Sequence, residues 1–323
     1  MEGNLNPPRG LRFACIALTA LALWLVFRQV DVASLGSTFR SMKPAWFLAA
    51  VVVFGLLFLP AAFRLHLIFR LAGIPARALE TLRTCLIGHL FYVVLLGAVG
   101  GDTARSAWYA RQHRVSFAEI LATAPLDRLL SFCGLLLFLG LSFGLAAAGG
   151  AFSALHSLHF KWPAWWLALA VISVVAGGFL LRGKNSHSFV GRFTSALTRI
   201  GKLLAGAPKV TLAGVLCGFS VQVALSGTLA LNLQSVSHAT LDWERLVWTL
   251  PVISIIGSLP IAVAGVGPRE GAALVLFGLY GVRAADAVAA SLLTLLASLV
   301  WAGAGGLIWW KAPPPKPEAI SQI

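Results

Sequence analysis

The chain has 323 residues, of which 59% are hydrophobic and only 11% are charged. Soluble domains carry about 25% charged residues, so this composition excludes a soluble globular protein and predicts an all-α polytopic membrane protein. The net charge is +14, and the 25 lysines and arginines lie mostly in short loops between apolar runs. That distribution is typical of the cytoplasmic side of helical membrane proteins and does not indicate nucleic-acid binding.

Six apolar runs are each long enough to cross a bilayer as a helix. In chain order they are residues 11–27, 44–63, 129–148, 163–181, 210–231 and 287–310. Arg9 and Arg12 precede the apolar stretch from Phe13 to Phe27, in the arrangement that a signal peptide has. No small-residue cleavage site follows it before Arg28, so we interpret it as an uncleaved first helix.

Two further apolar regions, 85–99 and 247–263, run into glycine-rich breaks that carry charges. The first break is Gly97-Ala-Val-Gly-Gly-Asp-Thr-Ala-Arg105, and the second is Gly265-Val-Gly-Pro-Arg-Glu-Gly271. Glycine and proline at membrane depth mark broken helices, which are tolerated where protein or water covers the backbone. We therefore expect two re-entrant helical hairpins, over 85–112 and 246–281. The alternative is two ordinary crossings joined by loops.

The chain is expected to form a single membrane domain over 1–323, with one hairpin in each half. The first half is 1–160, the second half is 161–310, and a disordered proline-rich tail follows over 311–323. Both halves have the same order of elements, with the hairpins entering from opposite sides, which predicts an inverted repeat.

Loop charges set the orientation of the crossings. After the second crossing, four basic residues are assigned to a cytoplasmic loop: Arg64, Arg70, Arg77 and Arg83. Both termini are then cytoplasmic, and the protein is expected in a bacterial inner membrane. Between the fourth and fifth crossings, apolar residues recur at helical spacing over 188–204, which predicts an amphipathic helix on the cytoplasmic surface. The alternative is a plain basic loop.

The first break supplies four candidate site residues. Asp102 and Arg105 lie three residues apart at the predicted start of a helix and therefore share a face. Asp102 is expected to be a cap or a first-turn acid of that helix. Gly100 and Gly101 would expose backbone N–H groups to an anion, and Arg105 would add a guanidinium group that matches phosphate. The alternative is a capped helix whose arginine faces the cytoplasm.

Asp127 and Arg128 form a second charged pair, at the start of a long apolar run. Inside the membrane this pair would need partners, and charge balance suggests Asp102 or Glu270. The alternative is an interfacial arginine whose charged end reaches water.

Arg269 and Glu270 lie between long uncharged stretches, directly after Gly267 and Pro268. Proline is well suited to the first position of a helix, so a new half-helix is predicted to begin here. Its N-terminal N–H groups would form a favourable phosphate site near the bilayer midplane. Gly265 and Gly267 belong to the same candidate site. The alternative is an ion pair that closes a loop outside the membrane.

Other motifs do not predict chemistry. Gly140-Leu-Ser-Phe-Gly144 matches a nucleophile-elbow string but lies within a helix, and we interpret it as a small-residue packing face. His89 is either a polar contact between helices or a proton relay. The sequence has no metal-binding spacing, no Walker lysine motif and no dinucleotide fingerprint. No catalytic residue, metal or cofactor is therefore predicted, and the protein is not expected to be an enzyme.

Four short motifs occur in the order of a known family: Gly100-Gly-Asp-Thr-Ala-Arg105, Leu126-Asp-Arg-Leu129, Leu259-Pro-Ile and Gly265-Val-Gly-Pro-Arg-Glu-Gly271. Over about 44–310 the chain resembles the flippase-like membrane family related to the transmembrane half of lysylphosphatidylglycerol synthase. The chain departs from that family in having no proline near the first break. It also has no aminoacyl-transferase domain after Trp310, so lysyl transfer is not implied.

The resemblance implies that a lipid or a lipid-linked intermediate moves between leaflets. By motif match, it implies a polar site made of Asp102, Arg105, Asp127, Arg128, Arg269 and Glu270. The expected function is a flippase-like transporter of an anionic phospholipid or lipid-linked intermediate. The alternatives are a membrane-embedded enzyme acting on a lipid phosphate and a non-transporting partner in lipid or glycan assembly. The expected partner is a membrane lipid with an anionic headgroup; a second copy of the chain and enzymes of lipid or glycan synthesis are further candidates.

Overall fold

The computed structural model describes residues 32–94, 98–150, 187–237, 240–258 and 267–311. These residues form helices joined by short turns, with no strand in the ranges described. The predicted crossings 11–27 and 163–181 lie outside the described residues, as do Gly265 and the tail after Lys311.

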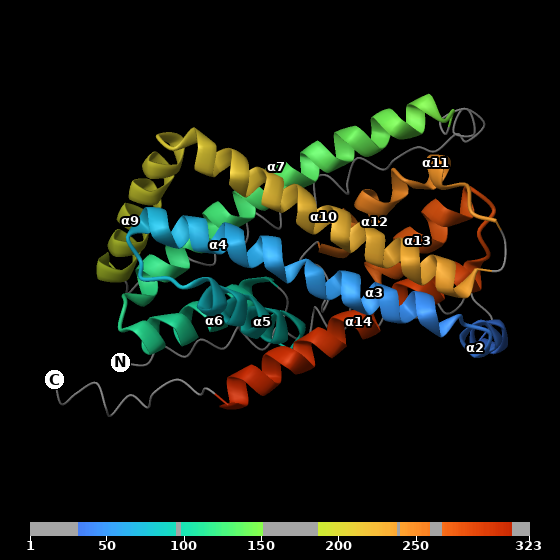
Figure 1. Ribbon diagram of the computed structural model, residues 1–323, viewed down its shortest axis with the longest axis horizontal. Helices are drawn as coiled ribbons and strands as arrows, with labels where there is room; N and C mark the ends of the chain where they lie inside the picture. The colour runs from blue at the N-terminus through green and yellow to red at the C-terminus, as the bar shows by residue number, and fades with distance from the viewer. Residues whose placement is uncertain (1–31, 95–97, 151–186, 238–239, 259–266, 312–323) are drawn as a thin grey trace. The chain divides into compact units, whose positions relative to one another are not determined.

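Figure 1 labels the described helices. Those before residue 150 are α2 (Val32–Arg40), α3 (Pro44–Leu56), α4 (Phe58–Ala72), α5 (Ala78–Val94), α6 (Ala98–His113) and α7 (Phe117–Ala148). Those after residue 186 are α9 (His187–Ala205), α10 (Pro208–Val236), α11 (Trp243–Leu246), α12 (Thr249–Ser258), α13 (Pro268–Gly278) and α14 (Ala284–Lys311).

Four helical stretches among the described residues are long and apolar enough to cross a membrane. They are Pro44–Ala72, which runs through α3 and α4, and the helices α7, α10 and α14. They contain the predicted crossings 44–63, 129–148, 210–231 and 287–310, and an all-α membrane protein is therefore confirmed. The first stretch continues nine residues beyond Phe63, so the assignment of Arg64 and Arg70 to a loop is wrong.

Helix α9 occupies the segment that was predicted to be an amphipathic helix. Ile200 and Leu204 are buried, whereas Arg199 and Lys202 are exposed. The helix and its two-sided character are therefore confirmed, and its position on the membrane surface stays a prediction.

The chain divides into two compact units that interleave along the sequence. Unit 1 consists of 1–48, 141–183 and 229–295, and unit 2 consists of 49–140, 184–228 and 296–323. Four of the five boundaries between the units fall inside helices, namely α3, α7, α10 and α14, and the fifth, at 183/184, lies outside the described residues. The division into a first half, 1–160, and a second half, 161–310, stays a prediction.

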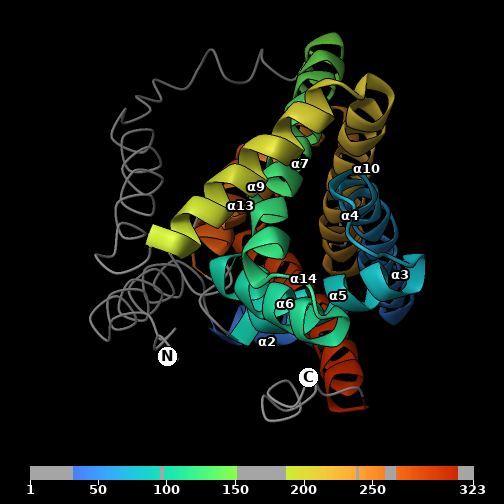
Figure 2. The ribbon, with the colours of Figure 1, turned by 90° about the vertical axis from the view of Figure 1, so that its left-hand side faces the viewer.

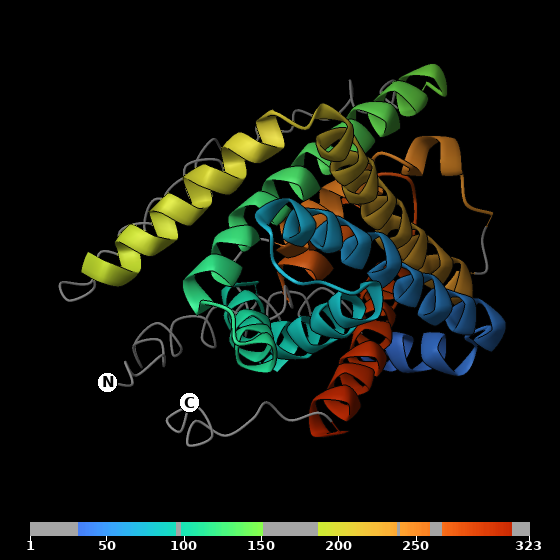
Figure 3. The same cartoon turned by 60° about the vertical axis from the view of Figure 1, so that its left-hand side comes forward.

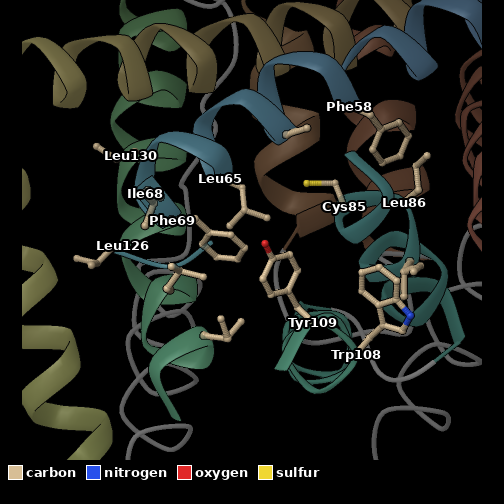
Figure 4. Close-up of a cluster of buried hydrophobic side chains, with 14 of the residues drawn as sticks. Phe58, Leu65, Ile68, Phe69, Cys85, Leu86, Trp108, Tyr109, Leu126 and Leu130 are labelled. Atoms are coloured by element: carbon tan, nitrogen blue, oxygen red, sulfur yellow. The ribbon is translucent and has the colours of Figure 1, made fainter. Parts of the chain in front are cut away.

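In unit 2, α5 packs against α6 (Figure 2), and α4 packs against both α5 and α9. The apolar core lies between α4, α5 and α6, where the rings of Phe69 and Tyr109 meet edge to face at a centroid distance of 4.8 Å (Figure 4). The Tyr109 hydroxyl donates a hydrogen bond to the Pro75 carbonyl oxygen. This bond joins α6 to the turn between α4 and α5 and so helps to hold α6 against α5.

Helices α7 and α10 approach each other through glycine in the same unit (Figure 3). A Cβ atom at Gly134 would lie 2.3 Å from the Phe219 nitrogen, and one at Gly218 would lie 2.7 Å from the Leu130 carbonyl oxygen. At Gly140 and Gly144, by contrast, a Cβ atom would meet no described atom within 4 Å. At 140–144 the two glycines therefore make no close contact with a described residue, whereas Gly134 does, and the small-residue packing face predicted there stays a prediction.

In unit 1, α12 and α13 pack against each other (Figure 1). The core of this unit contains fully buried side chains from four helices: Leu233 of α10, Ile253 of α12, Phe277 of α13 and Val288 of α14. Each glycine-rich segment thus runs into the first turns of the second helix of a contacting pair, α6 after α5 and α13 after α12. Whether these pairs enter the membrane from opposite sides stays a prediction.

Candidate functional site

Unit 2 brings five charged side chains into one connected cluster. Asp102 and Arg105 come from α6, Asp127 and Arg128 come from α7, and Arg64 comes from α4. We call these five residues the charge ladder. It contains all four charged residues that the sequence predicted for this region, together with Arg64, which was assigned to a loop.

Positively and negatively charged side chains alternate along the charge ladder. The guanidinium group of Arg128 donates to Asp102 with an Nε–Oδ2 distance of 2.7 Å. Nη2 of Arg105 lies 2.9 Å from Asp102 Oδ1 and 3.3 Å from Asp127 Oδ2. Nε of Arg64 lies 2.6 Å from Asp127 Oδ1. Each carboxylate is therefore shared by two arginines, and Arg105 joins the two carboxylates.

The charge ladder runs from an exposed end to a buried end. The exposed fraction of the side chain falls from 52% at Arg128 to 14% at Asp102 and 7% at Arg64. A buried charge is costly unless it is paired and hydrogen-bonded, which explains why each charge on the buried part has a partner of opposite sign. Burial opposes the positive charge of Arg105, but Asp102 and Asp127 outweigh it and raise the pKa of its guanidinium group.

Glycine lets α6 approach α5 beside this cluster. A Cβ atom at Gly101 would lie 2.7 Å from the Gly88 carbonyl oxygen, and one at Gly88 would lie 3.0 Å from Cδ of Arg105. Gly88 thus leaves room for the aliphatic part of Arg105. Helix α6 begins at Ala98, so Gly100 and Gly101 lie in its first turn, and no acid does. The prediction that Asp102 caps this helix or lies in its first turn is therefore wrong; its carboxylate binds arginines instead.

Unit 1 contains the second candidate cluster, at the start of α13. Helix α13 begins at Pro268, as predicted, with Gly267 as its N-cap at φ 100°. The side chain of Glu270 is fully buried and accepts a hydrogen bond from the Gly267 N–H at 2.6 Å. It also accepts from Arg269 Nη2 at 3.1 Å and from Ser291 Oγ at 2.9 Å. Glu270 therefore caps its own helix and neutralises Arg269.

Arg269 is held by Ser291 as well as by Glu270. Its Nε donates to Ser291 Oγ at 2.9 Å, and its Nη2 donates to the Ser291 carbonyl oxygen at 3.1 Å. A Cβ atom at Gly257 of α12 would lie 3.1 Å from Cβ of Arg269. In each helix pair, a glycine of the first helix thus packs against the arginine of the second. This shared feature is what duplicated hairpins would have, and the inverted repeat stays a prediction.

Two residues of these clusters were not predicted from the sequence to belong to a site. Arg64 carried a signal, because it lies between apolar residues on both sides, Phe63 and Leu65. Ser291 carried none, because serine is common in membrane helices. The suggested pairing of Arg128 with Asp102 is confirmed, whereas Glu270, the other suggested partner, binds Arg269 within unit 1.

His89 lies on α5 and makes a contact between helices. Its Nε2 atom lies 3.1 Å from both the carbonyl oxygen and the hydroxyl of Ser298 on α14. This geometry favours the polar contact over the proton relay. In the part of the chain that the structure describes, no group of three His, Cys, Asp or Glu side chains could hold a metal ion.

Cys85 lies on α5, buried near the charge ladder. Burial raises the pKa of its thiol to about 11, and the positive charge of Arg105 offsets this only in part. The thiolate is the reactive form, so the folded protein should label with maleimide at pH 8 roughly a hundredfold more slowly than a free thiol. The measurement uses a variant in which Ala replaces the other three cysteines: Cys15, Cys133 and Cys217. Unfolding should restore rapid labelling, and rapid labelling of the folded protein would contradict the burial.

The fold and the clusters together define a class: a helical polytopic membrane protein with arginine–carboxylate clusters at two pairs of contacting helices. The profile of a family described as the lysylphosphatidylglycerol synthase TM region matches residues 12–306. The chain belongs to this family, which confirms the resemblance based on the four motifs. No curated protein matches the chain.

Proposed function

We propose that the chain moves a lipid with an anionic headgroup between the two leaflets of a membrane. The observation that supports this most directly is the charge ladder, in which three arginines and two aspartates line up from an exposed end to a buried one. Ionisable groups within membrane helices are costly and usually mark the path of a polar substrate. The family to which the chain belongs is named after a region of a lipid-modifying protein, which agrees with a lipid substrate.

The physical task of such a transporter is to keep the headgroup charge away from hydrocarbon. A charge at the bilayer centre costs at least ~3 kcal/mol on insertion scales. Guanidinium groups offset this cost because their fork of N–H donors matches phosphate oxygens. The acyl chains can remain in the bilayer while the headgroup passes along the protein. The transporter we propose does not use ATP, performs no catalysis, and lies in a bacterial inner membrane with both termini in the cytoplasm.

An Arg269→Ala variant tests the proposal outside the charge ladder. We expect lipid transport to fall by at least about tenfold, which corresponds to about 1.4 kcal/mol of lost stabilisation. The measurement follows the movement of fluorescent phosphatidylglycerol between the leaflets of reconstituted vesicles. The matched control is Arg245→Ala, because Arg245 forms an exposed ion pair with Asp242 in the same unit.

The outcome separates three classes of function. Transport by Arg269→Ala at the native rate would remove Arg269 from the mechanism. A chemically altered lipid, detected by mass spectrometry after incubation with native protein, would indicate a membrane-embedded enzyme instead. Native biological activity of Arg269→Ala and Arg105→Ala without any lipid movement would indicate a partner in lipid or glycan assembly.

A further inference from the structure

Arg64 carries a donor that the charge ladder does not use. Its side chain is only 7% exposed, and its Nε binds Asp127 at 2.6 Å. Its Nη1 atom is buried and has no hydrogen-bond partner within the described ranges. A buried, charged donor without a partner costs free energy. An anion bound at this atom would remove that cost.

We propose that Arg64 is the inner binding group for a phosphodiester headgroup, which enters at Arg128 and passes along the charge ladder. This inference rests on the proposed function and specifies which ligand its polar site takes and where. Arg64 was not among the residues to which the family motifs pointed. Every residue of this path belongs to unit 2.

The charge balance of the ladder selects the class of headgroup. Its three arginines and two aspartates leave one positive charge in excess. A phosphodiester carries one negative charge and would make the occupied site neutral. A diphosphate carries more, and would leave uncompensated negative charge among buried groups. The site should therefore prefer a phosphodiester lipid to a lipid diphosphate.

The shared carboxylates supply a route for the headgroup. Asp102 binds both Arg128 and Arg105, and Asp127 binds both Arg105 and Arg64. A phosphate that replaces a carboxylate at one arginine leaves that carboxylate paired with the other. The headgroup can thus advance from Arg128 to Arg64 by exchanging partners, and no charge is left unpaired at any step.

The test measures lipid binding to the full chain in detergent micelles, separately from transport. We expect phosphatidylglycerol to bind at least about tenfold more tightly than farnesyl diphosphate or diacylglycerol. In Arg64→Gln the affinity for phosphatidylglycerol should fall by about tenfold or more, since a hydrogen bond between charged groups is stronger than one to a neutral amide. The control is Arg70→Gln, because Arg70 is exposed on the same helix; its affinity should not change.

Several results would overturn the assignment. They are native affinity in Arg64→Gln, a preference of the native protein for farnesyl diphosphate, and binding of soluble glycerophosphoglycerol as tight as that of the lipid. If Arg64→Gln does not fold, Arg64→Lys retains the charge without the fork and should also weaken binding. Native binding by a folded Arg64→Lys would then count against the proposal. If the native protein transports lipid and Arg64→Gln binds it with native affinity, only this inference is wrong. If the native protein binds lipid tightly but does not transport it, the proposed function is wrong.

Discussion

An Asp127→Ala variant is expected to lose about 3–5 kcal/mol of its free energy of unfolding, the range measured when one partner of a buried ion pair is removed. Asp127 binds Nε of Arg64 at 2.6 Å and Nη2 of Arg105 at 3.3 Å. Without it, Arg64 loses its only ion pair among the described residues, and Arg105 keeps Asp102 alone. The buried guanidinium groups of Arg64 and Arg105 would then share one carboxylate partner instead of two.

The measurement is reversible unfolding of the purified protein in mixed micelles. Glu119→Ala provides the control, because Glu119 lies on the same helix and also pairs with an arginine, Arg199. That pair is exposed on both sides and spans 3.7 Å, so its loss should change stability by less than about 1 kcal/mol. Equal losses in the two variants would show that Asp127 does not hold buried charges together.

Gly134→Ala is expected to destabilise the protein by about 3 kcal/mol, at the upper end of the usual cost of overpacking. The added Cβ would lie 2.3 Å from the Phe219 nitrogen and 2.4 Å from the carbonyl carbon of Gly218. These are backbone atoms of α10, so no side-chain rotation can relieve the contact. Helices α7 and α10 would have to separate, and α7 carries Asp127 and Arg128.

The same helix offers a control of opposite sign. Gly140→Ala meets no described atom within 4 Å, so it should stabilise α7 by about 0.5–1 kcal/mol, the usual gain of alanine over glycine in a helix. Thermal unfolding of both variants in the same detergent measures the difference. A Gly134→Ala protein as stable as Gly140→Ala would contradict the close approach of α7 and α10.

Local patterns in the sequence predicted those parts of the site that depend on neighbouring residues. The three-residue spacing of Asp102 and Arg105 predicted a shared helix face, and the two side chains are paired at 2.9 Å. The start of α13 at Pro268 followed from the preference of proline for the first helical position. Such features are decided within one turn of helix, where spacing along the chain sets distance in space.

Pairings between helices could not be read in this way. Arg64 follows a long apolar run, and an arginine at that point looks like the end of a crossing. Its role depends on Asp127, which is 63 residues away in the chain. The choice between Gly134 and Gly140 as the packing glycine was equally open, because both lie in apolar sequence and only the position of α10 distinguishes them.

By itself the sequence determined that this is a helical membrane protein of the lysylphosphatidylglycerol synthase TM family, because hydropathy and short motifs are properties of consecutive residues. The tertiary structure alone decided that α4, α6 and α7 bring five charges together and leave Nη1 of Arg64 without a described partner. The reason is physical: a buried charge is tolerated only beside its counter-charge, and that neighbour is chosen by how helices pack.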